Sequence, residues 1–342
     1  MKLFGTKSKT KKRRRPARSR PRARDQAPRE VEAFIAAPHE DLDPDPLRRL
    51  VQQERHNVIL LQRDRWEDHP QGEQICRQAV ECLDRRMALV PKGRANLLRT
   101  LTETPEANAR EVEVEPFLLD IHAVTNARFQ KFVDAGAYDD LSLWPESVWT
   151  HLIQMRDQTG KPGPRFWQGG RHDQRLRDHP VVGISWYEAA AYATWIGQRL
   201  PTDAEWQMAA SWRIRSETDV FYRFPWGDAM DRRKCNIWAS GLHGTAPVNA
   251  YPEGAAPNGV SQLIGNVWEW VACDLDLVTE EGVPVIAEMK AKGTRGGGFD
   301  TYFESQATSL FRTGHIALAR THNVGFRCGL SLSEAPWLGE AE

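Results

Sequence analysis

The chain has 342 residues, enough for one large hydrophobic core or two modest ones, and its formal net charge is zero. The charge is unevenly distributed, because residues 1–24 hold twelve Lys and Arg and no acid. The rest of the chain has the remaining 34 basic residues and all 46 acids, so it is acidic overall. Five cysteines without C-x-x-C spacing argue against a disulfide framework, and short apolar runs argue against a membrane span or signal peptide, so a cytoplasmic protein is expected.

Residues 1–40 are predicted to form a disordered basic tail. The stretch "KSKTKKRRRPARSRPRARDQ" is rich in Pro and Arg and too highly charged to bury apolar surface. Two interpretations stay open: residues 1–24 contact nucleic acid or another anionic surface, or they are a solubilising extension. A nucleic-acid-binding protein would show salt-dependent binding that is lost when these residues are deleted.

Residues 41–85 are predicted to form a short helical lead-in. Apolar residues recur at helical spacing over residues 46–67 and again over residues 73–88, so two helices are expected there. The first apolar stripe contains Leu47, Leu50, Val51, Val58 and Leu61.

From residue 86 the pattern changes to short strands, many Gly and Trp, and a few helices. "EVEVEPFLL", residues 111–119, alternates as a half-buried strand does. Helix start signals then follow at Thr125 and at two capping boxes. The boxes pair Ser185 with Glu188 and Thr202 with Glu205.

Seven motifs follow one another in a fixed order along this region. They are "HPVVGISWYEAAAYATWIGQRLPTDAEWQMAA", "FPWGD", "NIW", "GTAPVNAYP", "NGVSQLIGNVWEW", "RGGGFD" and "NVGFRCGLS". In this series the chain resembles the formylglycine-generating enzyme (sulfatase-modifying factor) family. The resemblance implies an α+β, C-type-lectin-like domain at residues 86–332 with little regular secondary structure, followed by a C-terminal tail at 333–342.

The residues after the Gly-Gly turn of the "RGGGFD" motif, counted from Gly297, argue against the copper chemistry of this family. Formylglycine-generating enzymes oxidise a sulfatase cysteine with copper held by two cysteine thiolates, and the matching positions here are Thr301 and Gln306. Neither side chain can supply a thiolate, and Cys328 belongs to a strand that the family buries. Copper-dependent oxidase activity is therefore not expected.

A second branch of the family resembles ergothioneine sulfoxide synthases, which bind non-haem iron through histidines of an added helical domain. No two histidines here are four residues apart, and the lead-in is too short to be that domain. A divergent iron-using oxidoreductase stays open as the alternative if the fold brings His243, His315 and His322 together.

A third branch uses the fold without catalysis, as a scaffold that displays a ligand-binding surface. Its varied residues match the segment Phe299–Asn323 here, although one sequence shows no variation. This branch gives the leading interpretation: a non-catalytic module that binds a protein or small molecule. The surface expected to bind lies around Trp268, Thr301, Gln306 and Arg312.

The stretch "LIGNVWEWVACD" raises a separate question about Glu269. The resemblance implies a structural calcium ion held by Gln262, Gly265, Val267 and Glu269, and calcium prefers such oxygen ligands. The alternative is that Glu269 caps backbone amides or pairs with an arginine. In both cases Trp268 and Trp270 are expected to be packing residues.

Overall fold

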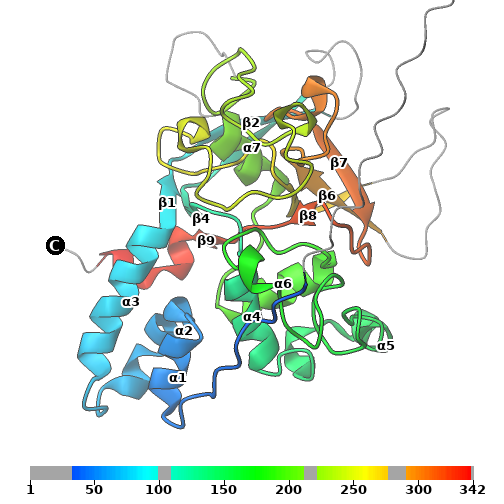
Figure 1. Ribbon diagram of the computed structural model, residues 1–342. Coiled ribbons are helices and arrows are strands. Elements are labelled where there is room, and N and C mark those ends of the chain that lie inside the picture. Colours follow the sequence, from blue (N-terminus) through cyan, green and yellow to red (C-terminus); the bar gives the residue numbers. More distant parts are fainter. Residues whose placement is uncertain (1–32, 99–108, 212–221, 276–289, 340–342) are drawn as a thin grey trace, which may run out of the picture. The chain divides into compact units, whose positions relative to one another are not determined.

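Short helices and short strands follow one another in groups along the computed structural model, which describes residues 33–98, 109–211, 222–275 and 290–339 (Figure 1). Residues 1–32 of the predicted basic tail lie outside the described residues. The helices are α1 Pro46–Gln52, α2 His56–Leu61, α3 Gly72–Arg86, α4 Asn126–Asp134, α5 Trp149–Leu152, α6 Trp186–Trp195 and α7 Asp203–Ser211. The strands are β1 Met87–Val90, β2 Gly93–Leu98, β3 Ala109–Val114, β4 Phe117–Asp120, β5 Trp268–Leu275, β6 Ala291–Arg295, β7 Arg312–Ile316, β8 Val324–Gly325 and β9 Gly329–Ser331.

The strands form small, mainly antiparallel sheets. One sheet has the order β1-β4-β9, a second is the β2-β3 pair, and the largest has the order β7-β6-β5-β8. In the largest sheet β5 pairs with β6 in the antiparallel direction and with β8 in the parallel direction. This arrangement confirms the predicted α+β class.

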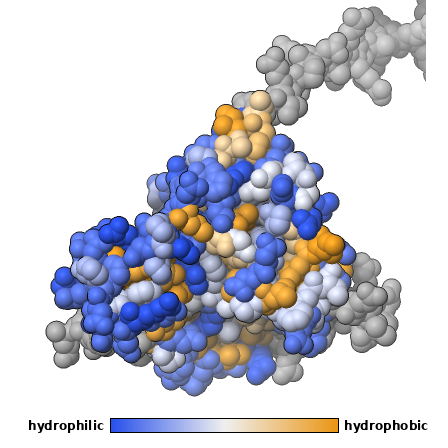
Figure 2. Space-filling view, turned by 90° about the horizontal axis from the view of Figure 1, so that it is seen from below, coloured by the Kyte–Doolittle hydropathy of each residue, from blue (hydrophilic) through white to orange (hydrophobic). Residues whose placement is uncertain are grey.

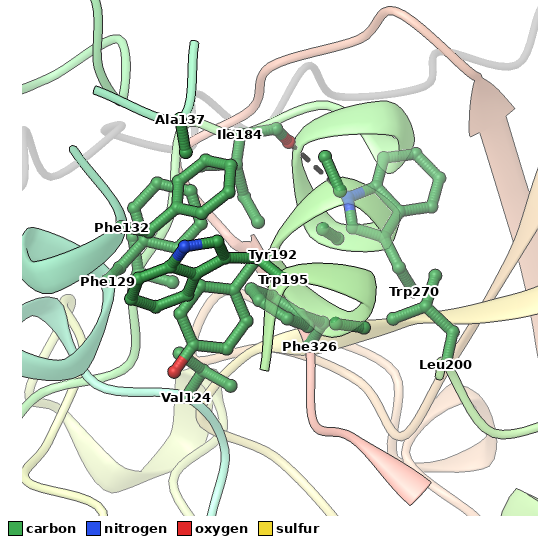
Figure 3. Close-up of a cluster of buried hydrophobic side chains, with 14 of the residues drawn as sticks. Val124, Phe129, Phe132, Ala137, Ile184, Tyr192, Trp195, Leu200, Trp270 and Phe326 are labelled. Atoms are coloured by element: carbon green, nitrogen blue, oxygen red, sulfur yellow. Dashed lines mark hydrogen bonds between the residues drawn. The ribbon is translucent and has the colours of Figure 1, made fainter. Parts of the chain in front are cut away.

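The largest hydrophobic core lies between α4, α6 and β5 (Figure 3). The ring of Phe129 stacks on that of Tyr192 with centroids 5.3 Å apart, and Phe326 meets Tyr192 edge to face. Trp270 is fully buried, and its indole N–H donates to the carbonyl of Ile184 at 3.3 Å. Trp270 is thus a core residue, as the sequence predicted for packing around Glu269.

The predicted helix over residues 46–67 is broken into α1, α2 and a 3-10 turn, Arg63–Trp66. Glu54 has a positive φ of 56°, and the N–H groups of Glu54 and Arg55 donate to the carbonyls of Val51 and Leu50. This is the Schellman pattern of a helix end, here with Glu in place of the usual Gly. Because no Gly or Pro marks the position, the single-helix prediction was wrong there.

The strand predicted over residues 111–119 is also divided. β3 pairs with β2 and ends at Val114, whereas β4 begins at Phe117 and pairs with β1 and β9. Glu115 and Pro116 separate the two strands, and Pro lacks the N–H that a continuous ladder would require. The alternating pattern therefore spans two sheets.

The predicted helix starts are confirmed. Thr125 accepts a hydrogen bond from the backbone N–H of Arg128 at the start of α4. Both capping boxes form, because the Ser185 and Thr202 hydroxyls accept from the N–H groups of Glu188 and Glu205, and each glutamate accepts in return. These helices position the residues discussed below.

The lead-in helices pack against the rest of the chain. The side chain of Arg55 donates to the Trp195 carbonyl at 2.7 Å, at the last residue of α6, and the Asn57 amide donates to the Gly197 carbonyl just after it. A third hydrophobic core joins α1–α3 to the C-terminal segment. It contains Leu47, Ile59, Ala79 and Leu83 together with Leu330, Ala335 and Trp337.

Glu54 provides an ionic link at this contact. Its carboxylate pairs with Lys131 of α4 at 2.7 Å and with Arg86 of α3. Burial alone would raise the pKa of Glu54, but the charges of Arg86 and Lys131 outweigh it and lower the pKa to about 2. The carboxylate is therefore ionised over the whole physiological range.

We expect this pair to give the protein an acid-sensitive contribution to stability. The depressed pKa stabilises the fold above the unfolded value of 4.5, and the contribution is lost as the pH falls from 4.5 towards 2. Urea unfolding at pH 6 should show Glu54→Gln less stable than wild type by on the order of 2 kcal/mol, and the gap should shrink at pH 3. An equal gap at both pH values would contradict this expectation.

The face seen from below is mainly hydrophilic, with hydrophobic side chains in separate groups (Figure 2). Small, separate groups of exposed apolar side chains are ordinary for a folded surface. Within the described ranges, no helix combines the length and the apolar character that crossing a bilayer requires.

Candidate functional site

The "LIGNVWEW" turn is tightly wound. Gly265 has a φ of 79°, and a Cβ atom there would lie 2.5 Å from the Asn236 carbonyl oxygen, so only glycine fits. Asn266 is buried and bonds three neighbouring segments: its amide donates to the Ala246 carbonyl and to Gln262 Oε1, and its oxygen accepts from Asn236. Asn266 holds this part of the fold together.

Glu269 forms a buried ion pair with Arg327. Glu269 is 1% exposed and Arg327 is 0% exposed, with Arg327 Nε and Nη2 at 2.8 and 2.7 Å from the two carboxylate oxygens. The indole N–H of Trp206 also donates to Glu269 Oε2 at 2.8 Å. The other Arg327 N–H groups donate to backbone carbonyls, those of Asp120, Ile121 and Ser261. Neither charge therefore lacks a partner.

This geometry favours the arginine-pairing alternative for Glu269. Both oxygens of Glu269 accept hydrogen bonds, and a Ca²⁺ ion bound there would lie beside a guanidinium. Among the other predicted ligands, Gln262 Oε1 accepts from Asn266, and the Gly265 carbonyl accepts from the Val267 N–H at 2.9 Å. The donor set therefore does not fit Ca²⁺ without rearrangement, and the calcium site stays a prediction that metal analysis must test.

The side chain of Thr301 stabilises the Gly298–Thr301 turn. Its hydroxyl accepts a hydrogen bond from the Gly298 N–H at 2.8 Å, and its backbone N–H donates to the Gly298 carbonyl at 3.0 Å. Thr301 is 5% exposed, whereas Gln306 is half-buried at the end of the 3-10 turn Glu304–Gln306. Of the two positions where the resemblance implies thiolates, Thr301 supports the Gly298–Thr301 turn and Gln306 ends the separate 3-10 turn Glu304–Gln306.

The structure brings together only some of the predicted ligand-binding residues. Trp268 is buried beside the Gly298–Thr301 turn, since a Cβ atom at Gly298 would lie 3.2 Å from its ring. Arg312, in contrast, donates to Asp203 at 3.1 Å, at the start of α7. No hydrogen bond or ion pair in the described part of the chain joins Arg312 to Trp268, Thr301 or Gln306.

An exposed aromatic group beside this turn was missed by the sequence analysis. We call it the aromatic rim: Trp238, His243, Tyr302 and Phe303. The Trp238 ring lies 4.6 Å from that of His243 and 6.4 Å from that of Tyr302, and Tyr302 contacts Phe303. The backbone N–H of Trp238 donates to the Thr301 carbonyl at 3.2 Å, which fixes the rim to the turn. The "NIW" motif signalled Trp238, but nothing local placed it beside Tyr302.

The three histidines of the iron alternative contact different groups. His243 contacts Trp238, His315 lies 5.9 Å from Trp270, and His322 lies 3.5 Å from the Asp300 carboxylate. Burial lowers the pKa of His315. Among the described residues, no three His, Cys, Asp or Glu side chains lie close enough together to hold a metal ion.

A polar pair links the turn to Asn323. The Asn323 amide donates to both oxygens of Asp300 at 3.2 and 3.0 Å, and the ring of Phe299 contacts His322. Trp268, the Asn323 carbonyl and the aromatic rim thus all lie next to the Gly298–Thr301 turn. The arrangement offers aromatic faces, a carboxylate and an imidazole to a ligand.

Comparison with curated proteins gives several relatives. The chain is 38% identical over 179 residues to the hercynine oxygenase of Mycobacterium tuberculosis, a match that covers 50% of this chain and only 40% of that protein. It is 33% identical over 271 residues to the formylglycine-generating enzyme of Thermomonospora curvata, covering 66% and 86%. It is 28% identical over 313 residues to the inactive C-alpha-formylglycine-generating enzyme 2 of Bos taurus, covering 82% and 96%.

Two further comparisons concern the fold and the family. The crystal structure of CarF superposes with a TM-score of 0.51 at 19% identity, covering 72% of this chain and 98% of CarF. That likeness shows the fold alone. The sequence model of the family described as the sulfatase-modifying factor enzyme 1-like domain matches residues 73–331. The chain therefore belongs to the formylglycine-generating enzyme, or sulfatase-modifying factor, family.

Proposed function

We propose that this chain is a non-catalytic member of its family that binds a partner or ligand around the Gly298–Thr301 turn. The observation that carries the proposal is Thr301: its hydroxyl is bonded within the turn, at a position where copper chemistry needs a thiolate. The nearest thiol in sequence is that of Cys328, which is fully buried, and burial raises its pKa well above the ordinary value. Cys328 is therefore a poor substitute ligand.

The aromatic rim supports a binding role. Trp238, Tyr302 and Phe303 are 46%, 68% and 61% exposed, and they lie together on two adjacent loops. Grouped exposed aromatic rings cost free energy in water and are typical of interaction surfaces. The name of the cattle relative, an inactive formylglycine-generating enzyme, is consistent with a family that includes non-catalytic proteins.

The proposal predicts no formylglycine formation. Purified protein incubated with copper, a thiol reductant, oxygen and a sulfatase-derived cysteine peptide should give no aldehyde product by mass spectrometry. A formylglycine-generating enzyme assayed in parallel is the positive control. Catalytic conversion of the peptide by this chain would overturn the proposal. Binding partners are then sought with wild type and a Trp238→Ala, Tyr302→Ala variant.

A second candidate is an oxygenase that uses iron, favoured by the identity to hercynine oxygenase over half of this chain. The match covers less than half of that protein, so its activity is not transferred on similarity alone. Iron analysis of the purified protein by mass spectrometry separates the two candidates. Stoichiometric iron that falls in His322→Ala would favour the oxygenase and disfavour the non-catalytic proposal.

The cellular setting belongs to the same proposal. All five cysteines are free thiols, which suits a reducing compartment such as the cytoplasm. Residues 1–24 carry twelve positive charges and offer a separate contact for nucleic acid or another anionic surface. Deleting them should leave binding by the aromatic rim unchanged.

A further inference from the structure

A cavity of about 650 Å³ lies apart from the Gly298–Thr301 turn and the aromatic rim. It lies between the segment around α5, the Arg165–Phe166 turn and the residues after β7. We call it the arginine pocket. Its lining residues include His151, Arg156, Asp157, Arg165, Phe166 and Arg320. This volume is in the range of small-molecule sites.

Arg320 forms the rigid back of the arginine pocket. Its guanidinium donates to the carbonyls of Gly183 at 3.1 Å, Arg156 at 2.9 Å and Gly163 at 2.5 Å. It also pairs with the buried carboxylate of Glu188 at 3.0 Å. With its charge compensated and its N–H groups bonded, Arg320 fixes the loops that line the pocket and is not a ligand donor.

Among the described residues that line the pocket, Asp157 is the one carboxylate, and its oxygens are already bonded. Oδ1 accepts from the N–H groups of Thr159 at 2.7 Å and Lys161 at 3.0 Å, and Oδ2 accepts from the Gly170 N–H at 2.6 Å. Burial would raise the pKa of Asp157, but these hydrogen bonds lower it overall. Asp157 thus supports its own loop, and among the described residues no ion pair joins it to Arg156 or Arg165.

Two arginines retain donors that face solvent. In the part of the chain that the structure describes, the Arg165 guanidinium has one partner, the Phe166 ring, at 5.9 Å from its centroid. Arg156 donates from Nε to the Ile153 carbonyl and from Nη1 to the Gly160 carbonyl. Among the described residues, no acceptor bonds its Nη2 group, so that group can donate to a ligand. Both side chains are exposed, so no carboxylate must be displaced before an anion binds.

We propose that the arginine pocket binds a small organic anion, with its phosphate or carboxylate on Arg156 and Arg165 and its apolar part against Phe166. Guanidinium groups pair with both anions through parallel N–H donors. Phe166 is 38% exposed, and Leu318 and Met155 add apolar wall beside it. The site therefore combines a charged end and an apolar end at the scale of one small molecule.

Phenyl phosphate is a suitable probe, measured by isothermal titration calorimetry at 50 mM NaCl. Arg165→Gln should weaken its binding about tenfold, the usual effect of one charge-assisted hydrogen bond. Arg165 is the cleaner variant, because Arg156 also bonds loop carbonyls. Arg233→Gln is the matched control, since Arg233 is an exposed arginine paired with Asp231 on another loop. It should bind phenyl phosphate as wild type does.

Two further arms test the two ends of the pocket. Phenol, which lacks the phosphate, and inorganic phosphate, which lacks the ring, should each bind at least tenfold more weakly than phenyl phosphate. Benzoate in place of phenyl phosphate shows which anion is preferred, and either preference supports the proposal. The proposal would be overturned if neither phenyl phosphate nor benzoate bound at millimolar concentration. It would also be overturned if Arg165→Gln kept the wild-type melting temperature and bound phenyl phosphate with unchanged affinity.

Discussion

Replacing Glu269 with alanine is expected to lower the free energy of unfolding by about 3–5 kcal/mol. The substitution leaves Arg327, which is 0% exposed, without its carboxylate, and it removes the acceptor of the Trp206 indole. Urea unfolding followed by tryptophan fluorescence measures the loss. Glu111→Ala is the matched control, because it breaks an exposed pair with Arg94 and should cost less than about 1 kcal/mol.

The same variant distinguishes ion pairing from calcium binding. If Glu269 acts through Arg327, the loss in Glu269→Ala should be equal with EDTA and with millimolar CaCl₂. A double variant, Glu269→Leu with Arg327→Met, should recover much of the stability, because it removes both buried charges. About one calcium per chain in wild type that disappears in Glu269→Ala would instead establish the calcium site predicted from the sequence.

Local chemistry explains which parts of the fold were predictable. The capping boxes at Ser185 and Thr202 formed as predicted, because each involves residues three positions apart. The end of α1 at Glu54 was not predictable in this way, since a left-handed Glu carries no signal of the kind that Gly provides. Pro116 did mark the break between β3 and β4, but the alternating pattern on both sides of it suggested one continuous strand.

The candidate site depends on contacts between residues far apart in sequence. The sequence drew attention to Glu269 but could not select its partner, because Arg327 lies 58 positions away. Likewise, Trp238 and Tyr302 come from separate loops that meet only in the folded chain. The motif order drew attention to Thr301 and Gln306, whereas the burial of Thr301 and the partner of Arg312 required coordinates.

Replacing Asp203 with alanine is the second substitution expected to have a large effect, again about 3–5 kcal/mol of unfolding free energy. Asp203 accepts from Arg295 Nε at 2.5 Å and from Arg312 Nη1 at 3.1 Å. Arg295 is 0% exposed, and its remaining N–H groups bond Gln207 and backbone carbonyls, so Asp203 supplies the carboxylate that compensates its charge. The variant leaves that charge buried and unpaired.

Arg312→Ala is the informative comparison for Asp203→Ala. Arg312 is 24% exposed in its side chain, and its loss leaves Asp203 paired with Arg295, so the cost should be about 1 kcal/mol or less. Urea unfolding should therefore rank Asp203→Ala far below Arg312→Ala in stability. Equal, small losses would show that Arg295 does not depend on Asp203. If Arg312 also binds a ligand, Arg312→Ala should weaken that binding while the protein keeps nearly wild-type stability. The reason is that the hydrogen bond from Arg312 to Asp203 positions the Arg312 side chain without supporting the core.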